Sequence, residues 1–298
     1  MTAHAPRAKL LAAFAAIYFI WGSTYLFIKF AIESIPSFMV GAARFWLAGI
    51  ILYVWARLRS GIRPTAGHWR DGLILGVFLL GAGNGCVVWA QQHVASGITA
   101  LIVAIVPLLV VLIEWLRPGG KRPSAAAIVG VLVGLGGMAL LIGPSAFLGA
   151  GDIDPLASLV LLLGSLSWSA ATVFAKRARV PPAPPLASAI QLIGGAASLT
   201  IVSALAGEFG RVEPAEIPLK GILSIAYLTI FGSIVAFSAY SWLMRVASPT
   251  KISTYAYVNP IVAMLLGWAV AGEEMSARVL IAAAIVLGGV VLITRKRE

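Results

Sequence analysis

The sequence predicts an all-α membrane protein with ten transmembrane helices, built as two inverted five-helix repeats with both termini in the cytoplasm. Of its 298 residues, 60% are hydrophobic and only 11% are charged, whereas soluble domains are about one-quarter charged. The hydrophobic residues form ten runs close to the roughly 20 residues that a membrane-spanning helix needs. In chain order, these runs cover residues 10–30, 36–57, 73–92, 97–116, 124–142, 155–175, 185–206, 219–243, 250–271 and 276–293.

Short polar segments separate the runs and set where each helix ends. The first run follows Arg7 and Lys9, but it is longer than the apolar core of a signal peptide and no small-residue cleavage site precedes the turn at 33–36. We therefore expect a retained first helix. Glycines in the third, fifth and tenth runs, such as Gly130 and Gly134, are expected to let helices pack closely. An oligomer is compatible with these glycine faces but is not required by them.

The distribution of charge predicts the orientation of the helices. Of the 22 Lys and Arg residues, 17 lie in alternate loops and terminal segments on one side of the predicted membrane, and four lie on the other side. Loops rich in Lys and Arg stay in the cytoplasm. Both termini are therefore expected there, and the net charge of +11 is explained by a lipid bilayer without any nucleic-acid partner.

The second half of the chain repeats features of the first half at a nearly constant offset. Because five is an odd number of crossings, the second unit enters the membrane from the opposite face, as in many secondary transporters with a central substrate site. We place the first unit at residues 1–147 and the second at residues 148–298. The matches are Trp21, Phe27, Lys29 and Ala31 with Trp168, Phe174, Lys176 and Ala178, then 94–96 with 246–248, Pro107 and Trp115 with Pro260 and Trp268, and 136–137 with 288–289.

A pattern of residues runs through both halves: Trp21 to Thr24, Arg44, Pro107, Trp168, Ser169, Asn259, Pro260 and the segment 267–273. This pattern resembles the EamA-like branch of the drug/metabolite transporter superfamily. The resemblance covers essentially the whole chain, and it implies ten helices in two inverted units that move small organic molecules, commonly outward. A narrower resemblance, to amino-acid exporters of the YddG type, rests on chain length and an aromatic-rich middle. One departure is Gln191, which stands where the repeat would place a second Arg44.

Signals of enzymatic chemistry are absent from the sequence. The three histidines, at positions 4, 68 and 93, have no metal-binding spacing, and Glu114 is the one carboxylate within a predicted span. A membrane-embedded enzyme needs acidic or histidine clusters at helical spacing. The glycine-rich segments lie in apolar helices, which excludes a phosphate-binding loop. We expect no catalytic residues, no metal and no cofactor.

Uncharged polar and aromatic residues within the spans are the candidates for lining a substrate cavity. Aromatic faces with scattered hydroxyl and amide groups suit an amphipathic solute or a delocalised cation. The resemblance implies that Trp21 and Trp168 face each other across the pseudo-two-fold axis. The alternative is that these residues anchor helices at the membrane interface. The candidates are Trp21, Thr24, Tyr25, Asn84, Trp89, Trp168, Ser169, Ser238, Tyr240 and Tyr255.

Three further residues are candidates for gating. Arg44 lies about two turns inside the second run, where it is either a gate or anion contact, or an arginine that reaches the interface or bonds neighbouring carbonyls. Pro107 and Pro260 lie at matching places inside the fourth and ninth runs. Each removes a backbone donor and bends its helix, which serves either as a hinge or as a static kink.

The sequence therefore favours a multi-pass protein of the bacterial inner membrane that exports small amphipathic metabolites by alternating access. Amino acids, aromatic ones included, are the expected substrates, and drug-like solutes are the related alternative. Facilitated diffusion is favoured over proton antiport because carboxylates are scarce at mid-membrane. The alternatives are a scaffold or binding subunit without transport, and a membrane-embedded enzyme that modifies lipid.

Overall fold

The computed structural model describes residues 6–120, 122–142, 154–247, 252 and 254–294, and all regular secondary structure within these ranges is helical. Each predicted run coincides with a helical stretch. Seven stretches are long and apolar enough to cross a membrane, and three shorter apolar helices lie at Ala125–Leu141, Val258–Ala271 and Ala277–Leu292. An all-helical membrane protein is thus confirmed, and ten spanning helices remain a prediction.

Six of the stretches are single helices. They are α3 (Ser37–Ser60), α8 (Ala125–Ile142), α10 (Pro155–Ala175), α11 (Pro184–Leu205), α15 (Tyr255–Ala271) and α16 (Ala277–Thr294). The other four are composite: α1 (Arg7–Ala15), η1 (Ala16–Ile20) and α2 (Trp21–Ile32); α4 (Ala66–Gly76), η2 (Val77–Asn84) and α5 (Gly85–Ala90); α6 (Ser96–Val103) and α7 (Val106–Leu116); α12 (Leu219–Tyr227), η5 (Leu228–Ala236) and α13 (Phe237–Val246).

Local sequence explains where the helices begin and end. The Asp154 carboxylate accepts from Leu156 N at 2.8 Å and caps the start of α10, where Pro155 has no N–H that would need an acceptor. Glu208, in the short 3₁₀ helix η3 (Glu208–Arg211), accepts from the backbone N–H groups of Phe38 and Met39 and so caps α3 from a distant loop. Gly61 and Gly272 directly follow α3 and α15 and cap their C-terminal ends, both with a φ of 64°, a conformation that favours glycine.

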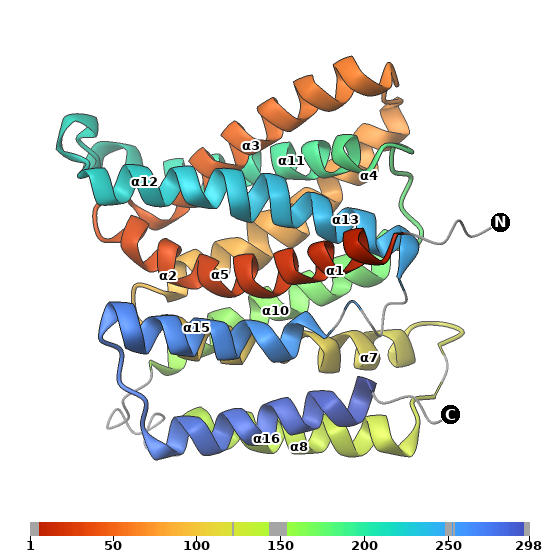
Figure 1. The fold of residues 1–298 in the computed structure, drawn as a ribbon, viewed down its shortest axis with the longest axis vertical. Coiled ribbons are helices and arrows are strands. Elements are labelled where there is room, and N and C mark those ends of the chain that lie inside the picture. The colour runs from red at the N-terminus through yellow and green to blue at the C-terminus, as the bar shows by residue number, and fades with distance from the viewer. Residues whose placement is uncertain (1–5, 121, 143–153, 248–251, 253, 295–298) are drawn as a thin grey trace.

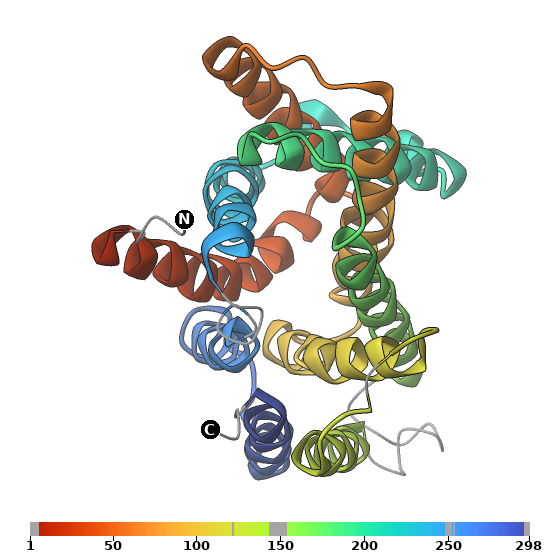
Figure 2. The same ribbon diagram turned by 90° about the vertical axis from the view of Figure 1, so that its right-hand side faces the viewer.

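The helices pack side by side, and Figure 1 shows that α1 begins and α16 ends at the same end of the bundle. The pairs α3 with α11, α8 with α16, and α6 with α15 are in contact. Also in contact are α2 with α12 and α15, and α10 with η2, α5 and α7. The α8–α16 pair forms a layer beneath the other helices (Figure 2).

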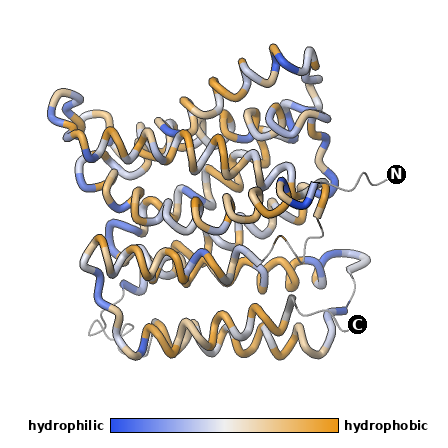
Figure 3. The backbone as a smooth tube through the Cα atoms, in the orientation of Figure 1, coloured by the Kyte–Doolittle hydropathy of each residue, from blue (hydrophilic) through white to orange (hydrophobic). Residues whose placement is uncertain are grey.

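The surface of the bundle is apolar along the helices, and hydrophilic residues gather mainly at the two ends (Figure 3). Large apolar side chains such as Leu58 and Leu205 are 80% and 84% exposed. A surface of this kind is stable in lipid, where the backbone groups must be bonded within the helices.

Glycines allow α8 and α16 to approach closely. A Cβ atom on Gly289 would lie 2.7 Å from both the Gly130 carbonyl oxygen and the Gly134 nitrogen, and one on Gly137 would lie 2.9 Å from the Val286 nitrogen. These glycines are therefore packing residues, as their spacing indicates.

Candidate functional site

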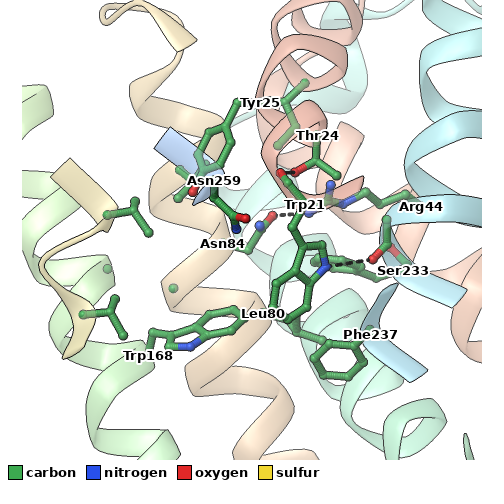
Figure 4. Close-up of a pocket in the computed structure, with 18 of the residues that line it drawn as sticks. Trp21, Thr24, Tyr25, Arg44, Leu80, Asn84, Trp168, Ser233, Phe237 and Asn259 are labelled. Carbon is green, nitrogen blue, oxygen red and sulfur yellow. Dashed lines mark hydrogen bonds between the residues drawn. The ribbon is translucent and has the colours of Figure 1, made fainter. Parts of the chain in front are cut away.

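A cavity of about 100 Å³ lies inside the bundle, with walls from both halves of the chain. The first half contributes residues of α2, α3, η2, α5, α6 and α7, and the second half contributes residues of α10, α11, η5, α13 and α15. A water molecule needs about 10–15 Å³ of such space, so the cavity holds several waters or a small solute. Figure 4 shows the side chains that converge on it.

Trp21 is the centre of the aromatic part of the cavity wall. Its ring lies edge to face with that of Trp168, with 6.4 Å between the ring centroids and 89° between the planes. Tyr255 and Phe237 also contact it, with centroids at 5.5 and 6.5 Å. The two tryptophans that match in the predicted repeat are thus in contact, one from each half of the chain.

Two π-helical turns border the cavity, and no pattern in the sequence predicts them. η2 contributes Asn84 and η5 contributes Ser233, and the two turns occupy matching places in the third and eighth helical stretches. Such turns break the regular i→i+4 bonding and are frequent at functional sites. The Trp21 ring nitrogen donates to the Gly232 carbonyl in η5 at 3.2 Å, and Ser167 donates to the Phe78 carbonyl in η2 at 2.8 Å.

Arg44 lies in the cavity wall rather than at the membrane interface. It is 4% exposed, and its guanidinium donates to the Asn84 side-chain oxygen and lies 4.4 Å from the centroid of the Phe45 ring. Its Nε has no hydrogen-bond partner among the described residues. None of the ion pairs found in the described ranges includes Arg44.

Six of the ten predicted lining residues border the cavity, and four do not. Trp89 packs on His93, with ring centroids 4.9 Å apart, and Ser169 is fully buried and donates to the Ser165 and Val106 carbonyls. Tyr240 does not line the cavity; its ring packs against the Trp21 ring, with 5.2 Å between the ring centroids. Ser238 is also outside the wall. The six that border it are Trp21, Thr24, Tyr25, Asn84, Trp168 and Tyr255.

Other lining residues have weak sequence signals or none. Phe237 and Ser233 line the cavity, but an aromatic and a serine in an apolar run are too common to single out. Asn259 lines it as well, and its signal is a polar side chain directly before an in-span proline. With its amide nitrogen turned toward η1, Asn259 donates to the carbonyls of Ile17 and Tyr18 at 3.1 and 3.0 Å.

The two in-span prolines have different local structures. Pro107 is the second residue of α7, just after the helix is interrupted at Ala104 and Ile105. Pro260 lies inside α15, which runs unbroken through it. Each follows a lining residue, Val106 or Asn259. Their role as hinges remains a prediction.

Ion pairs join the two halves at opposite ends of the bundle. We define the Glu273 cluster as Lys29, Ser96, Gly97 and Glu273: Lys29 Nζ lies 2.8 Å from Glu273 Oε1, and the Glu273 carboxylate accepts from Ser96 N at 2.8 Å and Gly97 N at 3.2 Å. It thereby caps α6. The elements it connects, α2 and α15, end on the left in Figure 1.

We define the Glu114 cluster as Glu114, Arg117 and Lys176. Lys176 Nζ lies 2.6 Å from Glu114 Oε1, and Arg117 Nη2 lies 2.8 Å from Glu114 Oε2. The elements that carry it, α7 and α10, end on the right in Figure 1. Lys29 and Lys176 match in the predicted repeat, so the lysines at the two matching positions each form an ion pair with the other half of the chain.

The Glu273 carboxylate is charged at neutral pH. Burial raises its pKa, but the hydrogen bonds from Lys29, Ser96 and Gly97 together outweigh this and hold the pKa below its usual range. A carboxyl with a lowered pKa stabilises the fold at pH values above its ordinary pKa of about 4.3, and this contribution is lost as the pH falls through the lower value.

We expect this cluster to be insensitive to pH across the physiological range. The difference in melting temperature between the wild type and Glu273→Gln, measured in detergent, should be constant from about pH 8 to pH 5 and should shrink below about pH 4. A difference that already vanishes between pH 8 and pH 6 would contradict the lowered pKa. Glu274→Gln, at the neighbouring position, is the control.

Within the described ranges, no three His, Cys, Asp or Glu side chains gather as a metal site. The cavity wall found there also contains no carboxylate. Its polar groups are amides, hydroxyls and one guanidinium, which bind and orient a solute rather than transfer protons at neutral pH.

Comparison with known proteins identifies a matching protein family and several relatives. The EamA-like transporter family matches residues 8–143 and 155–295. The uncharacterized inner membrane transporter YedA of Escherichia coli strain K12 is 37% identical over 286 residues, which cover 96% of this chain and 90% of YedA. The uncharacterized transporter YoaV of Bacillus subtilis is 23% identical, with 96% of this chain and 97% of YoaV covered.

A solved crystal structure has a similar fold. It superposes with a TM-score of 0.66 at 24% sequence identity and covers 97% of this chain and 96% of its own.

Proposed function

Because the chain belongs to the EamA-like transporter family, we propose that it exports small amphipathic metabolites by alternating access between residues 1–147 and 148–298. Amino acids, aromatic ones included, are the proposed substrates. The name of the Escherichia coli relative YedA, an inner membrane transporter, supports a multi-pass location in the bacterial inner membrane. The two matched segments, 8–143 and 155–295, fall one in each proposed half.

The observation that carries this proposal is a cavity walled by both halves, with a cross-half ion pair toward each end of the bundle. Lys29 of the first half pairs with Glu273, and Lys176 of the second half pairs with Glu114. Breaking one pair while the other holds would open the cavity to one side only. Two equivalent closures of this kind are what an inverted repeat supplies.

Facilitated diffusion is the mode that the cavity favours. A proton antiporter needs a group in the substrate pathway that gains and loses a proton, and the described wall holds no carboxylate or histidine. Glu273, whose pKa is lowered, does not titrate at neutral pH. We therefore propose uniport, with the direction of net export set by the solute gradient.

Counterflow in proteoliposomes tests this function. Vesicles loaded with an unlabelled amino acid should accumulate the same labelled amino acid from outside, and empty vesicles should not. We expect counterflow at equal pH on both sides and no absolute requirement for a pH gradient. Uptake that occurs only with a pH gradient would refute uniport, and the absence of counterflow for a full panel of amino acids and drug-like cations would refute transport.

The alternative functions are less well supported. A scaffold or binding subunit predicts a packed interior, whereas this interior contains a cavity with polar and aromatic walls. A lipid-modifying enzyme requires clustered catalytic groups, and no three His, Cys, Asp or Glu side chains of the described residues gather as a metal site. The family is named for transport.

A further inference from the structure

The Arg44 guanidinium is a buried positive charge that has no acidic partner within the described chain. Its one side-chain hydrogen-bond partner there is neutral, the Asn84 oxygen. The Phe45 ring offers a cation–π contact, which offsets only part of a charge. Removing an ion from water is costly unless a counter-ion and hydrogen bonds replace the water. The cavity wall therefore carries a charge that the described residues leave uncompensated.

Two polar groups of this wall also lack hydrogen-bond partners. Arg44 Nε is buried without an acceptor, and the Ser165 hydroxyl is buried without any partner among the described residues. Buried polar groups are nearly always bonded. The Arg44 guanidinium thus has both an unpaired donor and an uncompensated charge, and an anionic oxygen would satisfy both. A carboxylate is the group that fits best, because it matches the planar guanidinium in geometry as well as in charge.

We infer that the cavity binds solutes through a carboxylate held by Arg44, and that it rejects cations lacking this group. This inference rests on the transport proposed above, and it identifies the carboxylate as the substrate group that the cavity recognises. Trp21, Trp168 and Phe237 line the same cavity and contact the apolar part of the solute. Cationic drugs are excluded because an unneutralised guanidinium repels them in a medium of low dielectric constant.

Calorimetric titration of the purified full-length protein tests binding separately from transport. The probes are L-phenylalanine and 3-phenylpropionate, which carry a carboxylate, and L-phenylalaninamide and phenethylamine, which do not. We expect at least one carboxylate to bind and both carboxylate-free probes to bind about 30-fold more weakly or worse. Comparable binding of the amide or the amine, or no binding of either carboxylate, would overturn the inference.

Variants distinguish the charge of Arg44 from its role in packing. Asn84→Asp keeps the shape of the side chain but places a counter-ion on Arg44, so carboxylate binding should fall about 30-fold or more while the melting temperature is maintained or rises. Arg44→Lys should retain part of the binding and Arg44→Gln should lose it. Arg57→Gln, on the same helix but bonded to the Gly61 carbonyl, should bind like the wild type.

A purely structural Arg44 predicts the opposite for Asn84→Asp, namely unchanged binding, and this result would also overturn the inference. Counterflow of the same probes judges the transport proposal separately. Carboxylates that bind but show no counterflow would refute transport and leave the inference standing. Counterflow of phenethylamine without that of either carboxylate would refute the inference and leave transport standing.

Discussion

Tethering either cross-half ion pair is expected to stop transport. In a Cys86→Ala background, which removes the single native cysteine, a short bis-methanethiosulfonate would link Lys29→Cys to Glu273→Cys, or Glu114→Cys to Lys176→Cys. Each tether fixes one end of the cavity shut, and alternating access requires both ends to open in turn. We expect counterflow to fall to the level of empty vesicles with either tether and to return after reduction.

The chain offers a matched control for this experiment. Arg117 contacts the same Glu114 carboxylate as Lys176. Unlike Lys176, it belongs to the same half of the chain as Glu114 and follows it by three residues. A Glu114→Cys and Arg117→Cys pair treated with the same reagent is therefore tethered within one half, and its counterflow should be the same before and after treatment. Full transport through either cross-half tether, with linkage verified by mass, would contradict alternating access at these clusters.

The fold was predictable because lipid imposes a simple rule on sequence. Uninterrupted apolar runs must form helices, since unbonded backbone groups are not tolerated in hydrocarbon, and each of the ten runs contains a helix. The π-helical turns were not predictable. The segment from Val77 to Asn84 contains two glycines, but glycine is frequent in membrane-spanning helices and does not by itself predict a π-helical turn. Contacts with distant helices are also invisible in the sequence, such as the hydrogen bond that Ser167 of α10 donates to the Phe78 carbonyl.

The candidate site was predictable in composition but not in detail. Trp21 and Trp89 both lie in apolar helices, yet Trp21 borders the cavity and Trp89 packs on His93. The difference depends on the rotation of each helix about its axis, which the tertiary packing determines. Hydrophobic periodicity reports this rotation poorly when lipid and protein interior are equally apolar.

The predicted repeat likewise does not indicate which charged residue reaches the cavity. Arg44 does so from α3, whereas the matching Gln191 of α11 does not line it. The backbone of Gln191 instead packs against Gly76 of α4. The halves are therefore unequal at this pair of positions, and only one of them places a charge in the wall.

Gly76→Ala is expected to be strongly destabilising for this reason. A Cβ atom at Gly76 would lie 2.1 Å from the Gln191 carbonyl oxygen and 2.9 Å from the Gly195 nitrogen, and both of these are backbone atoms that cannot rotate away. Relief requires α4 and α11 to move apart. Overpacking costs about 1–3 kcal/mol and occasionally more, and we expect about 3 kcal/mol or more here.

The matched control is Gly136→Ala in α8, because a Cβ atom there has no atom within 4 Å. It makes the same chemical change in a helix and should be neutral or slightly stabilising, since alanine is the better helix former. Thermal unfolding in detergent should show a large fall in melting temperature for Gly76→Ala alone. Equal melting temperatures for the two variants would contradict the close approach of α4 and α11. Because η2 begins at the next residue, Val77, we also expect Gly76→Ala to impair carboxylate binding in the fraction that folds.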